Sequence, residues 1–93
     1  MTTDLATRLR RLLDVIQRVH DCKRLVAEQM VADECKVVRR YIGNLATNYV
    51  RVGHRPSLRF DVAGVERLEA RYALPLRYLV TYEAACARHG EAA

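Results

Sequence analysis

Glycine, proline and large aromatic residues are scarce in this chain of 93 residues, and long apolar runs are absent. The chain has four glycines, two prolines, one phenylalanine and no tryptophan. Its longest apolar stretches span only a few residues, whereas a membrane-spanning helix needs about 20. The first residues also lack the apolar segment of a secretory signal. We therefore expect a cytoplasmic protein with no membrane partner.

Cysteine is present but without the spacing of a disulfide framework or a metal site. Cys22, Cys35 and Cys86 form no C-x-x-C pair, which favours buried thiols in a reducing compartment. Cys86 and His89 have a metal-like spacing, but structural zinc sites usually need two tight pairs that converge. The sequence therefore predicts no metal and no cofactor.

Motifs for catalysis are also missing. The chain contains no glycine-rich phosphate loop, no G-x-S-x-G turn, and no Cys–His pair in a context that suggests a nucleophile. We therefore expect a protein that is not an enzyme.

Positive charge is concentrated in the first two thirds of the chain. The net charge is +5, and 14 of the 16 basic residues are arginine. Residues 35–60 contain six basic side chains and no carboxylate. A one-sided basic field of this kind is typical of a polyanion-binding surface. The alternative is a surface made basic for solubility, in which carboxylates would be interspersed. The six residues are Lys36, Arg39, Arg40, Arg51, Arg55 and Arg59.

Hydrophobic spacing predicts three helices in the first half of the chain. The first covers residues 4–20, with Thr3 or Asp4 as its cap. The second runs from Cys22 to about Val31, with Asp21 as its cap. The third covers residues 34–48 after a cap at Asp33. Gly43 inside the third helix would permit close approach of another helix or a backbone.

The pattern changes after residue 48. Residues 50–52 and 57–62 alternate between apolar and polar side chains around the turn-like segment 53–56. This pattern favours a β-hairpin over 49–62. Helical spacing returns after it, with a break expected before Pro75 and a last helix ending near Arg88. The predicted fold is mainly α in one domain. It has a helix-turn-helix core (1–48), a β-hairpin wing (49–62) and C-terminal helices (63–90).

The segment LVAEQMVADECKVVRRYI, residues 25–42, resembles the helix-turn-helix of bacterial and phage DNA-binding regulators. In that family a short helix with a small residue near its start leads through a tight turn into a recognition helix. Ala27 matches the small residue, Val31 and Ala32 the turn, and Asp33 the cap. The turn usually has a glycine where Val31 stands. The resemblance implies a winged helix-turn-helix regulator that binds double-stranded DNA, with helix 34–48 in the major groove.

Two groups of DNA-contacting residues follow from this hypothesis. The residues expected to contact base edges lie at the start of the recognition helix. They are Glu34, Lys36, Val37, Arg39 and Arg40. Other basic residues are expected to contact phosphates or to belong to the wing. They are Lys23, Arg24, Arg51, His54, Arg55 and Arg59.

A homodimer is the second functional expectation, because a domain of this size gains stability from pairing. The first and last helices have wide apolar stripes that we expect at the interface. The candidates are Leu5, Leu9, Leu12, Leu76, Tyr78, Leu79 and Tyr82. Two alternatives to a DNA-binding regulator stay open. One is a protein-interaction module that docks a nucleic-acid-handling enzyme, and the other is a helical RNA-binding domain.

Overall fold

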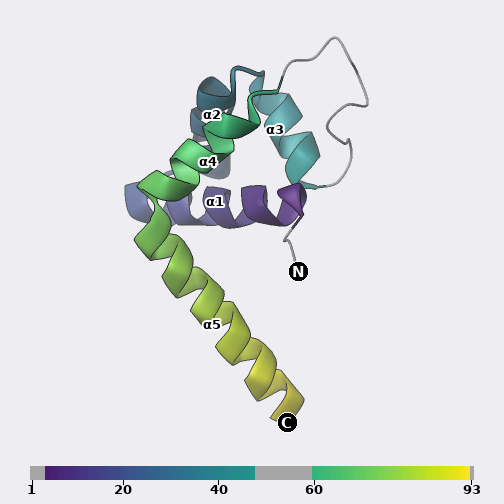
Figure 1. The fold of residues 1–93 in the computed structure, drawn as a ribbon, viewed down its shortest axis with the longest axis vertical. Helices are drawn as coiled ribbons and strands as arrows, with labels where there is room; N and C mark the ends of the chain where they lie inside the picture. Colours follow the sequence, from purple (N-terminus) through teal and green to yellow (C-terminus); the bar gives the residue numbers. More distant parts are fainter. Residues whose placement is uncertain (1–3, 48–59, 93) are drawn as a thin grey trace.

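The computed structural model describes residues 4–47 and 60–92, with side chains up to residue 87. This part of the chain forms five helices: α1 (Leu5–His20), α2 (Arg24–Cys35), α3 (Arg39–Ala46), α4 (Val62–Arg71) and α5 (Ala73–Ala92). Helices α2, α3 and α4 lie over α1, and α5 leaves this four-helix body and extends away from it (Figure 1). The mainly helical class predicted from the sequence therefore fits.

Helix α1 forms as its sequence predicts. The Asp4 carboxylate accepts a hydrogen bond of 2.8 Å from the Thr7 amide, which satisfies one of the free N–H groups of the first turn. Leucine and isoleucine side chains at helical spacing face the core and are fully buried. These are Leu9, Leu12, Leu13 and Ile16. The helix ends where Asp21 adopts a left-handed conformation with φ of 49°, so Asp21 ends α1 and does not cap α2.

The boundary between α2 and α3 differs from the prediction of a helix over 34–48. Helix α2 continues to Cys35, because Val31, Ala32 and Cys35 are fully buried and keep its inner face in the core. The Asp33 carboxylate accepts a hydrogen bond from Gln29 within α2 and does not cap α3. The turn therefore occupies residues 36–38, and α3 begins at Arg39.

The predicted β-hairpin wing over 49–62 is wrong, because the described residues contain no strand. Phe60 and Asp61 belong to neither helix nor strand, and Val62 is the first residue of α4. The Asp61 amide donates to the Cys35 carbonyl at 3.1 Å, which fixes the start of α4 to the end of α2. The other wing residues, 49–59, lie outside the described residues.

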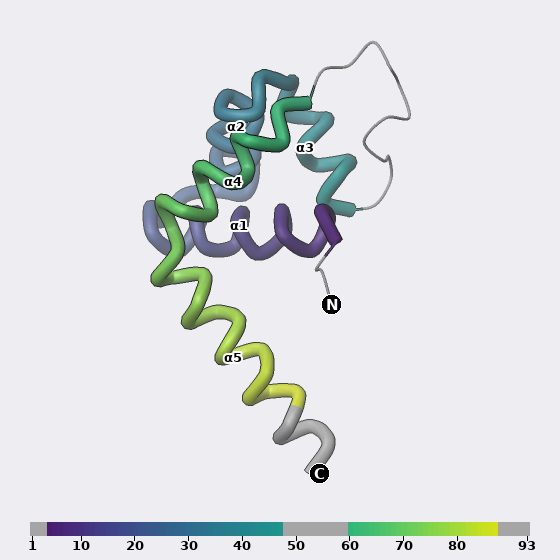
Figure 2. The backbone as a smooth tube through the Cα atoms, in the orientation of Figure 1, coloured from purple at the N-terminus to yellow at the C-terminus, as the bar shows by residue number. Residues whose placement is uncertain are grey.

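The predicted break before Pro75 also lies elsewhere. Helix α4 ends at Arg71, and Tyr72 separates it from α5. Pro75 is the third residue of α5, in the first turn, where a missing N–H costs no intrahelical bond. The chain therefore changes direction before Ala73, as the path of the backbone shows (Figure 2).

A single hydrophobic core lies where α1 meets the other four helices. It includes side chains from every helix, from Leu9 of α1 to Leu79 of α5. No side-chain nitrogen or oxygen of the described residues is buried without a hydrogen-bond partner. Across the same residues no helix combines the length and the apolar character that crossing a bilayer requires.

Candidate nucleic-acid interface

Helix α3 has one buried and one accessible face. Tyr41, Ile42, Leu45 and Ala46 are buried in the core. Arg40 and Thr47 are exposed on the other side, and Asn44 is partly exposed between them. Because these three positions follow the spacing i, i+4 and i+7, they lie on one stripe of the helix surface. The accessible face of α3 is therefore polar, carries an arginine and has no carboxylate.

Arg39 and Arg40 have different roles, although they are adjacent in the sequence. Arg39 donates to the Glu28 carboxylate of α2 at 3.1 Å, and the Glu28 side chain is only 12% exposed. Gly43, one turn later, lies beside the same carboxylate, within contact distance of Glu28 Oε2 for an added Cβ. The nearest neighbour of Gly43 is thus a side chain, and not the helix or backbone expected from the sequence. Arg39 therefore ties α3 to α2, whereas Arg40 faces solvent.

Both ends of α3 are held by other parts of the chain. The Arg10 guanidinium of α1 donates to the Ala46 carbonyl at 2.6 Å, which satisfies an acceptor at the C-terminal end. At its N-terminal half, the Tyr41 ring packs edge-to-face against Phe60, with ring centroids 6.0 Å apart. The N-cap residue of α3, Val38, makes no side-chain hydrogen bond to the first turn. The core, Arg10 and Phe60 therefore hold α3 in place, with its accessible face toward solvent.

The remaining residues predicted to contact bases lie outside α3. Glu34 is on the last turn of α2, where its carboxylate accepts from Arg67 of α4 at 2.8 Å. Lys36 is exposed and left-handed, with φ of 59°, at the position where α2 ends. Val37 is partly buried against the core. Of the predicted group, only Arg40 combines a place on α3 with free exposure.

Arg67 also shapes the electrostatics at the junction of α2 and α4. It donates to both Glu34 and Asp61, at 2.8 and 3.1 Å. These hydrogen bonds lower the pKa of the Glu34 carboxyl and the pKa of the Asp61 carboxyl below their ordinary values. Both carboxylates are therefore charged at pH 7, and Arg67 offsets the charge of one of the two.

The predicted phosphate-contacting residues are only partly described. Lys23 is exposed at the start of α2, as its N-cap residue. Arg24 donates to Asp14 at 2.9 Å and to Gln17 at 3.2 Å, so it fixes α2 to α1. Four further candidates lie outside the described residues. They are Arg51, His54, Arg55 and Arg59.

Asn44 and Thr47 were missed by the sequence interpretation. Once Ile42 and Leu45 are assigned to the core, the opposite side of the helix contains Arg40, Asn44 and Thr47. The spacing of these three residues is visible in the sequence. Because the helix was predicted to start at residue 34, however, the predicted base contacts included residues 34–37.

Most of the predicted dimer candidates lie in the core. Leu9 and Leu12 are fully buried, and Leu79 is 8% exposed. Leu5 and Leu76 are partly buried against the same core. Tyr78 and Tyr82, in contrast, are exposed. The α1 candidates are therefore used inside the chain, and among the predicted dimer candidates only Tyr78 and Tyr82 are exposed.

The cysteines show no sign of a shared site within the described residues. Cys35 is buried, Cys22 is partly buried and Cys86 is exposed. Burial raises the pKa of the Cys35 thiol to about 11, which makes it unreactive at pH 7. Across the part of the chain that the structure describes, no three His, Cys, Asp or Glu side chains are close enough to hold a metal ion.

Comparison with known proteins gives no relative: no protein-family model, no curated protein and no solved structure matches the chain. The function must therefore be argued from the residues of the chain itself.

Proposed function

We propose that this chain binds double-stranded DNA and that α3 enters the major groove. The observation that carries the proposal is the accessible face of α3, on which Arg40, Asn44 and Thr47 lie in one stripe. The helix behind this face is fixed by buried side chains, by the Arg39–Glu28 ion pair and by the Arg10 cap. A rigid helix with a polar face is the element that fits the B-DNA major groove.

The residue types on this face match the chemistry of base edges. Arginine can donate two hydrogen bonds to guanine O6 and N7, and asparagine can bond adenine N6 and N7. Thr47 adds a hydroxyl and a methyl group at the far end of the stripe. No carboxylate lies between Cys35 and Thr47 to repel phosphates. We therefore assign base contacts to Arg40 and Asn44.

The connection between α2 and α3 supports the same assignment. Two helices joined by a turn of three to four residues form the helix-turn-helix motif, whose second helix contacts the bases. Here α2, the turn at residues 36–38 and α3 follow in that order. In this assignment the turn and the start of the second helix lie about five residues later than the sequence predicts. Lys36, exposed in the turn, is assigned to a phosphate.

The test begins with selection of bound sequences from random duplex DNA. Affinity for the selected duplex is then measured by fluorescence anisotropy for the wild type and for two variants with the same loss of charge, Arg40→Ala and Arg77→Ala. Arg77 is exposed on α5, and the described residues of α5 make no contact with α3. Loss of a base contact costs about 1–3 kcal/mol, so Arg40→Ala should weaken binding roughly 5- to 150-fold. Arg77→Ala should leave it within about twofold, since a charge removed far from the DNA is largely screened.

Salt dependence separates base contacts from phosphate contacts. Each neutralised phosphate adds about 0.9 to the slope of log affinity against log salt. Lys36→Ala should therefore reduce the slope by about one, whereas Arg40→Ala should lower affinity with little change in slope. Equal loss in Arg40→Ala and Arg77→Ala would contradict the proposal. So would tighter binding to structured RNA than to duplex DNA.

A further inference from the structure

Helix α5 extends well beyond the core that the other helices share. Its 20 residues correspond to about 30 Å of helix, and it leaves the four-helix body and extends away from it (Figure 1). Leu79 is its last buried side chain, and the ion pair between Arg11 and Glu83, at 2.9 Å, is its last described tie to α1. Helical segments of this length are marginal in water without tertiary contacts. The outer part of α5 therefore needs a partner to cover it.

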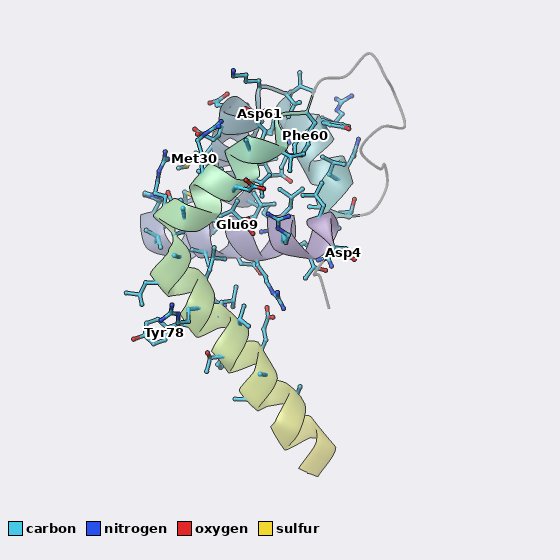
Figure 3. The ribbon with its side chains drawn as sticks, in the orientation of Figure 1. Asp4, Met30, Phe60, Asp61, Glu69 and Tyr78 are labelled. Carbon is cyan, nitrogen blue, oxygen red and sulfur yellow. The ribbon has the colours of Figure 1, made fainter. Side chains whose placement is uncertain are left out.

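One side of α5 carries an apolar stripe at coiled-coil spacing. Pro75, Tyr78, Tyr82 and Ala85 are separated by three, four and three residues, which places them on one side of the helix. The side chains of Tyr78 and Tyr82 are 69% and 63% exposed. Tyr78 projects from the side of α5 (Figure 3), and Pro75 and Ala85 are partly exposed. The two tyrosines of the stripe therefore face solvent, and the stripe itself contains no charged residue.

The stripe continues onto α1 and forms an open groove of about 440 Å³. Val15, Arg18 and Val19 of α1 line one side of the groove. Pro75, Tyr78, Leu79 and Tyr82 of α5 line the other. Val19 is 51% exposed, although it is apolar. The exposed apolar surface thus includes the tyrosine stripe of α5 and Val19 of α1. Together they form a shallow groove into which another helix could pack.

We propose that this groove binds α5 of a second copy of the chain, with the two α5 helices antiparallel and related by a two-fold axis near Val80. In this register Tyr78 of each copy meets Tyr82 of the other, because both lie two residues from the centre. Likewise Pro75 meets Ala85, five residues from the centre. One two-fold contact covers both tyrosines of both copies.

The exposed apolar side chains provide a large part of the area that a dimer needs. Buried aromatic side chains each remove about 150–250 Å² from water, so two tyrosines that are two-thirds exposed provide roughly 200–330 Å² per copy. A specific interface needs about 1,000 Å² in total, or about 500 Å² per copy. The tyrosines supply about half of that, and Leu74 and Val19, both more than half exposed, add to it.

The first test measures the mass in solution over a protein concentration series. The wild type should approach about 21 kDa, twice the 10.7 kDa of one chain. Tyr82→Lys places a charge inside the stripe and should give 10.7 kDa at concentrations where the wild type is dimeric. Val80→Lys is the matched control, because Val80 lies on the opposite side of α5 and should leave the dimer intact. Circular dichroism of both variants verifies that they fold.

The second test fixes the register by cysteine cross-linking in a background with Cys22→Ser and Cys86→Ser. Ala85→Cys alone should not cross-link, because two copies of position 85 would be about 15 Å apart in the antiparallel pair. Pro75→Cys alone should not cross-link for the same reason. The double variant should form a disulfide-linked dimer under mild oxidation.

Each possible result decides the proposal. Cross-linking of either single variant would show a parallel pair and overturn the register. A wild type that stays at 10.7 kDa at all concentrations, or a Val80→Lys variant that dissociates as fully as Tyr82→Lys, would overturn the interface. Neither measurement contains DNA, so the dimer and the DNA-binding proposal fail or stand separately.

Discussion

Gly64 is the position at which one added methyl group should reveal most about the packing of this fold. It lies buried in the first turn of α4, where α4 crosses the end of α2. A Cβ at this position would be 2.7 Å from the Glu34 carbonyl oxygen and 3.0 Å from Cys35 Sγ. The first contact is with backbone and the second with a buried side chain, so neither group can move aside alone. We expect Gly64→Ala to force α2 and α4 apart.

Two opposing effects set the change in the free energy of unfolding for Gly64→Ala. Overpacking a well-packed site typically costs about 1–3 kcal/mol. Alanine regains up to about 1 kcal/mol of helix propensity relative to glycine, and less in a first turn. The net expectation is a loss of about 1–2 kcal/mol. For a domain of this size, each 1 kcal/mol lowers Tm by about 4–8 °C.

Gly43→Ala is the matched control. Its Cβ would lie 2.9 Å from Glu28 Oε2, which is the end of a flexible side chain that can rotate away. The change would weaken the Arg39–Glu28 pair, worth up to about 1 kcal/mol, while it gains a similar helix propensity. Thermal and urea unfolding, followed by circular dichroism at one protein concentration, should therefore show a destabilised Gly64→Ala and a nearly unchanged Gly43→Ala. The reverse order would refute the α2–α4 packing described above.

The remaining predictions concern charge and thiol chemistry. Because the pKa values of Glu34 and Asp61 are lowered from 4.5 and 3.8 in the folded chain, their contribution to stability is present at neutral pH and lost as the pH falls below about 4.5. Urea unfolding from pH 7 to pH 3 should show a smaller loss of stability for Arg67→Gln than for the wild type, and equal losses would contradict the role of Arg67. Cys35 should resist alkylation at pH 8 in the native protein and react on unfolding, since its pKa is raised to about 11. Peptide mapping by mass spectrometry measures this, and rapid native labelling of Cys35 would contradict its burial.

The sequence predicted the features of a helix that depend only on residues close together in the chain. In α1 the expected cap at Thr3 or Asp4 and the leucines at helical spacing predict the start of the helix and the face that is buried, and the structure assigns the cap to Asp4. These features are local, because capping and periodicity depend on residues within a few turns. The end of α2 has no such marker. Lys36 adopts the left-handed conformation that glycine usually supplies, so the residue type at this position does not indicate the end of the helix.

The wrong predictions concern features that depend on contacts between residues far apart in the sequence. Val62 continues an alternating pattern, yet it begins a helix because Asp61 bonds the Cys35 carbonyl and Gly64 fits against Glu34. The dimer candidates on α1 failed for a related reason. Periodicity shows that Leu9 and Leu12 share an apolar face, but it cannot show whether that face packs against the same chain or against another.

Titration of the isotope-labelled protein with a selected DNA duplex, followed by backbone amide NMR at low salt, tests directly whether α3 binds DNA. The amides of Arg40, Gly43, Asn44 and Thr47 should shift or broaden, together with those of the turn at residues 36–38. The amides on the outer half of α5 should change little. Unchanged α3 amides at saturating DNA, or changes confined to α5, would contradict the assignment of α3 as the DNA-binding element.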